Sequence, residues 1–221
     1  MYMETEKVID WRSETIWALI ACACAIPWLS YVAFEYINLD FWRDEMYSLE
    51  HFVFVPITTI VTDYHIPNNH IFANLLNHIF LYTLNLEDTD LLRYPWKIRI
   101  LMFLYTIITF VYVYRTGRDF FHPLAGVLSV MILGSTLPFL NCAVQVRGYS
   151  LSIMLSAISI YHIIRYHKIG RTKDIILIFF FGLLIDLHNT IKYLRSYIID
   201  DIMGIFSRVS MFYQQTNNIW S

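Results

Sequence analysis

Apolar residues gather in long runs along the chain, and short polar loops separate them. Five runs are predicted to be membrane-spanning helices, because about 20 apolar residues cross the hydrocarbon core of a bilayer. They cover residues 15–34, 98–114, 124–144, 150–164 and 175–191. The predicted fold class is therefore all-α, a multi-pass transmembrane helical bundle over residues 1–193, followed by a tail over residues 194–221.

One polar island, residues 41–85, lies between the first two spans. Asp40 is expected to cap a helix from Phe41 to about Val53 that lies on the membrane surface. The run Ile71–Leu86 is too short to span, and its polar residues form a helical stripe: His70, Asn74, Asn77, His78 and Asn85. A polar stripe with an apolar back predicts a second interfacial, or re-entrant, helix in this outer loop.

Composition supports a membrane protein. Hydrophobic residues make up 57% of the chain and charged residues 15%, with a mean hydropathy of +0.48. Soluble domains have about 45–50% apolar and about 25% charged residues. The net charge of −2 and the absence of a basic stripe exclude a nucleic-acid partner.

Loop charges predict the topology. The basic loops 115–118 and 165–173 are expected in the cytoplasm by the positive-inside rule. Two predicted spans lie between these loops, so both loops fall on the same side of the membrane, as the rule requires. The same count puts the polar island and Arg147–Tyr149 together on the outer face of the cytoplasmic membrane.

Two adjacent acids, Asp44 and Glu45, open the island. A carboxylate at a lipid surface can act as the general base for an incoming hydroxyl or amine. The other acid could hold a divalent ion or orient the acceptor. The alternative is a pair of ordinary exposed acids, one of them paired with Arg43.

A divalent metal ion has three candidate ligands, Glu45, His65 and His70, although the histidine spacing is no tight signature. The alternative is a pair of interfacial histidines that bind headgroups or backbone. Asn69, with Asn68, either forms a turn after Pro67 or presents amides to a sugar or phosphate.

Arg147 follows the third predicted span on the same face as the acids. Its guanidinium suits a phosphate group, which it can bind through two parallel hydrogen bonds, and Tyr149 adds a hydroxyl donor. The alternative is an Arg–Tyr pair that anchors the helix end at the membrane interface.

Four short motifs, in order, resemble those of the GT-C superfamily of polyprenyl-phosphate-sugar glycosyltransferases, such as protein O-mannosyltransferases and aminoarabinose transferases. They are Asp44-Glu45, Asn68-Asn69-His70-Ile71-Phe72, Arg93-Tyr94-Pro95 and Arg147-Gly148-Tyr149-Ser150-Leu151. The resemblance implies Asp44 as the base, Arg147 as a donor-phosphate contact, and Glu45 and His70 in supporting or metal-linked roles. Ile71 replaces the family's usual proline. Family members have more spans and a C-terminal domain, so the resemblance implies an N-terminal part.

The sequence therefore predicts a multi-pass enzyme of the inner membrane that transfers a sugar from a polyprenyl-phosphate donor to a lipid, glycan or protein acceptor at the outer face. The catalytic candidates are Asp44 and Glu45, and the substrate-binding candidates are Asn69, His70, Arg147 and Tyr149. Membrane lipids are the surrounding partners. Two alternatives stay open: a non-catalytic membrane module or transporter fragment, and a membrane metallohydrolase.

Overall fold

The computed structural model describes residues 11–63 and 69–189, which form helices without any strand, so the all-α prediction is confirmed. The elements follow one another as α1 (Trp11–Tyr36), α2 (Arg43–Ser48), the π-helix η1 (Leu49–Val53), α3 (Ile57–Thr62), α4 (Ile71–Thr83), α5 (Asp88–Arg93), α6 (Trp96–Phe120), α7 (Pro123–Gly134), α8 (Leu137–Val144), α9 (Tyr149–Ile169) and α10 (Thr172–Asn189).

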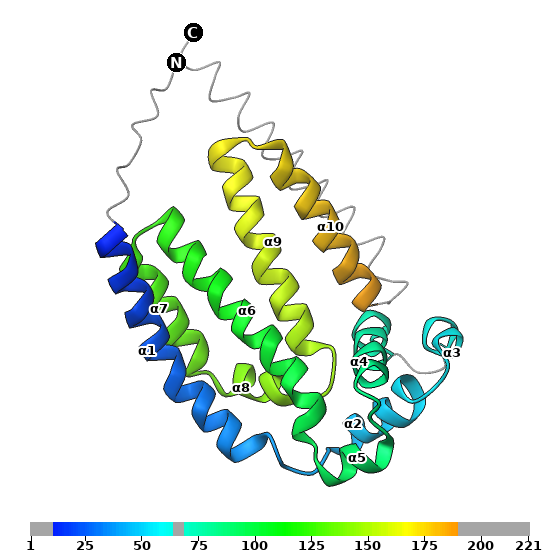
Figure 1. Cartoon of the computed structure of the whole chain (residues 1–221). Coiled ribbons are helices and arrows are strands. Elements are labelled where there is room, and N and C mark those ends of the chain that lie inside the picture. Colours follow the sequence, from blue (N-terminus) through cyan, green and yellow to red (C-terminus); the bar gives the residue numbers. More distant parts are fainter. Residues whose placement is uncertain (1–10, 64–68, 190–221) are drawn as a thin grey trace.

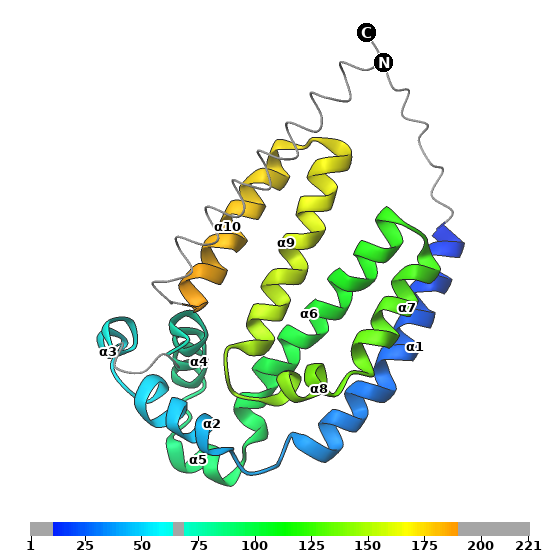
Figure 2. The ribbon, with the colours of Figure 1, turned by 180° about the vertical axis from the view of Figure 1, so that it is seen from behind.

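The long helices run side by side, and the short ones gather at one end of the bundle (Figures 1 and 2). Helix α6 packs against both α7 and α9, α1 packs on α7, and α10 packs on α9. The short elements α4 and α5 contact α6, and η1 packs on α4. Their shared core contains Leu49, Val53, Leu81, Leu91, Ile98 and Val146.

Among the described helices, α6 is long and apolar enough to cross a bilayer, and α7 with α8 counts as a second span if the bent pair is taken as one. The 25 residues of α6 measure about 37 Å, more than the roughly 30 Å of a hydrocarbon core. The other spans of the five-span bundle stay predictions.

The single helix expected over residues 124–144 is broken, with a 74° bend between α7 and α8. Pro138 near the start of α8 supplies no backbone N–H, so a continuous helix would lose a hydrogen bond there. The Ser135 and Thr136 hydroxyls instead donate to the carbonyls of Ile132 and Leu133, at 2.9 and 2.8 Å. The backbone N–H groups of Ser135 and Thr136 donate to the same two carbonyls, both at 3.2 Å, so each turn residue binds the end of α7 twice.

Two glycines set the contact between α6 and α7. A Cβ built on Gly117 would lie 2.5 Å from the Cα of Gly126, and one built on Gly126 would lie 2.6 Å from the carbonyl oxygen of Tyr114. No side chain fits at such distances. The two helix backbones therefore touch only because both positions are glycine.

The first helix of the polar island begins later than predicted. Residue Asp40 is not its cap: α2 begins at Arg43, and the N-cap is Trp42, whose backbone N–H donates to Glu45 Oε2 at 2.9 Å. From Leu49 the helix continues as the π-helix η1, which ends before Pro56. A π-helix is rare and often lies near a functional site.

The second helix of the island is where it was expected, but its polar stripe turns inward. Asn74 and Asn77 in α4 are buried rather than directed at a membrane surface. The Asn74 amide donates to Asn69 Oδ1 at 2.9 Å, and His78 Nδ1 binds the Val53 carbonyl at 2.7 Å. The stripe thus joins α4 to the segments before it.

The loop expected between the island and α6 contains a short helix, α5. The Lys97 ammonium donates to Asp90 Oδ1 at 3.0 Å, which ties α5 to the first turn of α6. This hydrogen bond, with one from the Glu87 N–H, lowers the pKa of Asp90 below its ordinary value. The ion pair helps to fix the direction in which the chain enters α6.

Candidate active site

The two adjacent acids of the island have opposite environments. The side chain of Glu45 is 1% exposed, whereas that of Asp44 is 63% exposed. Neighbouring residues on a helix point about 100° apart, so adjacent side chains can reach different environments. Asp44 therefore presents its carboxylate to the surroundings, while Glu45 belongs to the interior.

Both oxygens of Glu45 accept hydrogen bonds from the protein. Oε1 accepts from the Val146 N–H at 2.6 Å. Oε2 accepts from the Trp42 N–H at 2.9 Å and from Arg99 Nη2 at 3.4 Å. These donors satisfy the buried carboxylate, which fixes the segment before α9 against α2.

Arg99 is the buried partner of Glu45, and it also binds the backbone at the end of α1. Its Nη1 donates to the carbonyls of Tyr36, Ile37 and Leu39, and Nη2 lies 3.4 Å from that of Asp40. Its guanidinium also lies over the ring of Phe41, at 5.0 Å from the centroid. One side chain of α6 therefore holds the whole connection between α1 and α2.

Sequence reasoning gave Arg99 no role. The available signal was an arginine one turn inside an apolar run, where an unpaired charge is costly and a buried partner is expected. The run does not reveal that the partners lie some sixty positions earlier in the chain.

The predicted phosphate-binding arginine lies beside the exposed acid. Arg147 Nη1 is 3.2 Å from Asp44 Oδ2, and the Arg147 side chain is only 15% exposed. Its guanidinium lies over the ring of Tyr149, 4.9 Å from the centroid. Because Val146 is bound by Glu45, the residue that follows it is placed next to Asp44.

His70 closes the other side of this group. Its ring meets that of Tyr149 edge to face, with 5.6 Å between centroids. His70 directly precedes α4, and Tyr149 begins α9, so these contacts join two elements that are distant in the sequence. The result is a continuous row of side chains from α2 to α4: Asp44, Arg147, Tyr149 and His70.

Asn69 is held away from this row by its own hydrogen bonds. It is 4% exposed, and its amide donates to the carbonyls of Ile60 and Asp63 at 3.0 and 2.8 Å, while its oxygen accepts from Asn74. The side chain thus connects the end of α3 to α4. In this arrangement Asn69 positions its neighbour His70.

The proposed metal ligands do not form a set in the described part of the chain. There, no group of three or more His, Cys, Asp or Glu side chains is placed to hold a metal ion. Both Glu45 oxygens accept hydrogen bonds from the protein. His65 lies outside the described residues, so metal binding stays a prediction.

The row combines an exposed carboxylate, which can accept a proton, with a mostly buried guanidinium, which can bind an anion. Such a pair suits a reaction in which a hydroxyl or amine attacks while a phosphate leaves. Comparison with protein families bears on this chemistry. A family model described as dolichyl-phosphate-mannose-protein mannosyltransferase matches residues 93–206.

The chain belongs to this family. The match also places it in the GT-C superfamily, as the short motifs predicted. Members are membrane proteins with glycosyltransferase activity of the GT-C type. Nothing matches the chain among curated proteins or among solved structures.

The matched range divides the candidate site. It includes Arg147 and Tyr149, but begins after Asp44, Glu45 and His70. The contacts of Asp44 with Arg147 and of His70 with Tyr149 therefore connect the matched segment to the polar island that precedes it.

Proposed function

We propose that this chain transfers a sugar from a polyprenyl-phosphate donor to a hydroxyl or amine acceptor at the outer face of the cytoplasmic membrane. The observation that carries the proposal is the 3.2 Å approach of the exposed Asp44 carboxylate to Arg147, inside a family of GT-C glycosyltransferases. Once this ion pair opens to admit the reacting carbon between the two groups, the acid can serve the attacking end of a displacement and the guanidinium the leaving end.

In the proposed reaction, Asp44 accepts the proton of the acceptor as its oxygen or nitrogen attacks the anomeric carbon of the sugar. The bond from that carbon to the phosphate oxygen breaks, and the phosphate leaves with the bonding electrons. Arg147 stabilises the charge that develops on this oxygen. Direct displacement inverts the configuration at the anomeric carbon.

Donor binding would also free the base. The Arg147 guanidinium is paired with Asp44 before substrate arrives, and a phosphate competes for the same N–H groups. Exchange of one anion for the other would leave Asp44 beside the donor with its carboxylate available to the acceptor. Glu45 would act as a positioning residue, because it holds both α2 and the Val146 backbone.

The arrangement of charges supports an outer-face site. The basic residues predicted to lie in loops 115–118 and 165–173 fall mostly in the last turns of α6 and α9. These helix ends lie at the end of the bundle opposite to α2, α4 and α5 (Figure 1). The length of α6 allows these two ends to face opposite sides of a bilayer. With the basic end in the cytoplasm, the candidate site faces outward.

A lipid-linked sugar assay on the full chain tests the proposal. Asp44→Asn keeps the size of the side chain but removes its basicity, and should lower the transfer rate by about 10²–10⁴-fold. Glu50→Gln is the matched control, because Glu50 is an exposed acid of the same island outside the row of side chains. Full turnover by the Asp44→Asn protein would exclude Asp44 as the base.

A further inference from the structure

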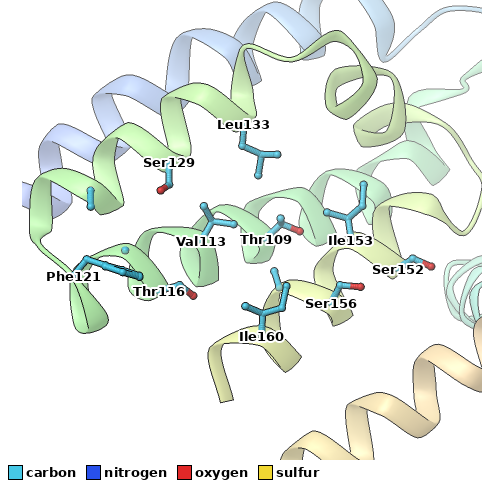
Figure 3. A pocket seen from close by; sticks show the side chains of 13 residues that line it. Thr109, Val113, Thr116, Phe121, Ser129, Leu133, Ser152, Ile153, Ser156 and Ile160 are labelled. Carbon is cyan, nitrogen blue, oxygen red and sulfur yellow. The ribbon is translucent and has the colours of Figure 1, made fainter. Parts of the chain in front are cut away.

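A trough of about 460 Å³ runs along α6, away from the candidate active site residues. Its floor is α6, and its walls are α7 and α9 (Figure 3). Phe121 lies at one end and Ser152 at the other. From Thr109 to Phe121 the floor extends over about 18 Å, close to half the thickness of a bilayer with its hydrocarbon core of about 30 Å.

The trough is narrow and apolar in character. The hydroxyls of Thr109 and Thr116 on the floor donate to carbonyls of their own helix, Tyr105 and Tyr112, at 2.9 and 2.8 Å. The walls carry small side chains such as Ser129 and Ser156 between larger aliphatic ones. Such a surface favours a thin, flexible hydrocarbon chain over a sugar or a charged group.

A cation stands at the Phe121 end. Lys168 Nζ lies 5.7 Å from the centroid of the Phe121 ring and 5.4 Å from that of Phe120, and it donates to the Phe120 carbonyl at 2.7 Å. Lys168 is exposed, and an ammonium has three N–H donors, so it can also bind a phosphate.

Nearby acids do not neutralise this lysine. Asp119 is within ion-pair distance of Arg115 and Arg118, and Asp174 is within that distance of His162 and Arg165. In the described ranges, no carboxylate therefore lies within ion-pair distance of Lys168. Arg171 in the loop before α10 and Lys173 in its first turn make this end of the bundle basic.

We propose that the trough binds one acyl chain of an anionic phospholipid, with the headgroup phosphate at Lys168. Apolar walls of acyl-chain length and a cation at one mouth match the two parts of such a lipid. Basic groups between helices on the cytoplasmic side attract anionic headgroups. This site is independent of sugar transfer, because its phosphate lies at the end of α6 opposite to Arg147.

Native mass spectrometry of the purified full chain can detect the lipid. The protein is taken from vesicles with equal amounts of phosphatidylglycerol and phosphatidylcholine that carry identical acyl chains. Preferential retention of phosphatidylglycerol is expected. Lys168→Gln should reduce that retention about fivefold, and Lys168→Arg should restore it. Lys173→Gln, a lysine at the same end that is not part of the trough, should leave it unchanged.

A second variant tests the acyl chain separately from the headgroup. Ser156→Phe fills the trough and should abolish retention of phosphatidylglycerol while Lys168 is intact. Ser129→Leu provides the same test from the opposite wall if the first variant does not fold. If both filled variants still retain phosphatidylglycerol, the lipid binds elsewhere and the proposal is wrong.

Four further results would contradict the assignment. They are equal retention of the two phospholipids, equal losses in Lys168→Gln and Lys173→Gln, displacement of phosphatidylglycerol by an equimolar polyprenyl phosphate, and cross-linking of the trough to a second copy of the chain. The third result would assign the trough to the sugar donor, and the fourth to a protein interface.

Discussion

Glu45 and Arg99 form a buried ion pair across 54 positions of the chain, with 3.4 Å between Oε2 and Nη2. The pair sits between the end of α1 and the start of α2, beside the first turn of α6. Each partner also binds backbone groups, so the charges are surrounded by hydrogen bonds. The pair therefore holds together the elements on which the candidate active site is built.

Removal of one charge of this pair should unfold the site. Glu45→Gln leaves the buried Arg99 without its counter-charge, and should cost about 3 kcal/mol in the free energy of unfolding. Asp44→Asn, at an exposed pair, should cost less than about 1 kcal/mol. Chemical unfolding in detergent micelles measures both. A stable Glu45→Gln protein that has lost transfer would instead assign Glu45 to the chemistry.

Arg147 should control the use of the donor. Arg147→Ala removes a charge-assisted contact to phosphate and should raise the KM for the lipid-linked sugar about tenfold or more. Arg147→Lys keeps the charge but loses the planar fork, so an intermediate KM is expected. Donor titrations measure these values. Arg93→Ala, at an exposed arginine of α5, serves as the control, and an equal rise there would contradict the assignment.

The glycine contact between α6 and α7 should not tolerate a methyl group. Gly126→Ala places a Cβ 2.6 Å from the Tyr114 carbonyl oxygen, and overpacking of this kind costs about 1–3 kcal/mol. At Gly182 in α10, by contrast, an added Cβ would meet nothing within 4 Å. Gly182→Ala should therefore stabilise its helix by about 0.5–1 kcal/mol. Thermal unfolding of both variants shows whether the signs differ.

Asp90 should make stability depend on pH in the acidic range. Its pKa is lowered in the folded protein by the hydrogen bond from Lys97. A lowered folded pKa gives a contribution that is present above the unfolded value of about 3.9 and is lost as the pH falls through the folded value. Asp90→Asn should remove this dependence. Unfolding midpoints of both proteins between neutral and acidic pH measure the difference, and identical profiles would contradict the prediction.

The sequence predicted helices wherever an apolar run was long, because burial in lipid or in a core demands such runs. It could not locate the break after Gly134, because the run of apolar residues continues through Pro138 into α8. The π-helix after Ser48 was also missed, since its wider turn depends on packing beneath it. The polar stripe of α4 was wrongly predicted to face the membrane surface. The spacing of polar residues does not show whether they contact water or a buried hydrogen-bond partner.

The sequence predicted which residues lie together in the candidate site, but not what each of them does there. Charge counting along the loops placed Asp44 and Arg147 on one face, and the structure brings them to 3.2 Å. The separation of Asp44 from Glu45 was not predictable, because it depends on Val146 and Arg99, which are distant in the sequence. Local patterns carry no information about such long-range donors.

The hydrogen bond from Val146 to Glu45 joins positions 101 residues apart. A ribosome makes the polar island long before it makes this partner. Until Val146 and Arg147 have been synthesised, Glu45 lacks the backbone donor that fixes the island, and Asp44 lacks its partner Arg147. Biosynthesis would therefore complete the anion-binding pair only after the first turn of α9 has emerged, so that assembly of the site follows insertion of the helices before it.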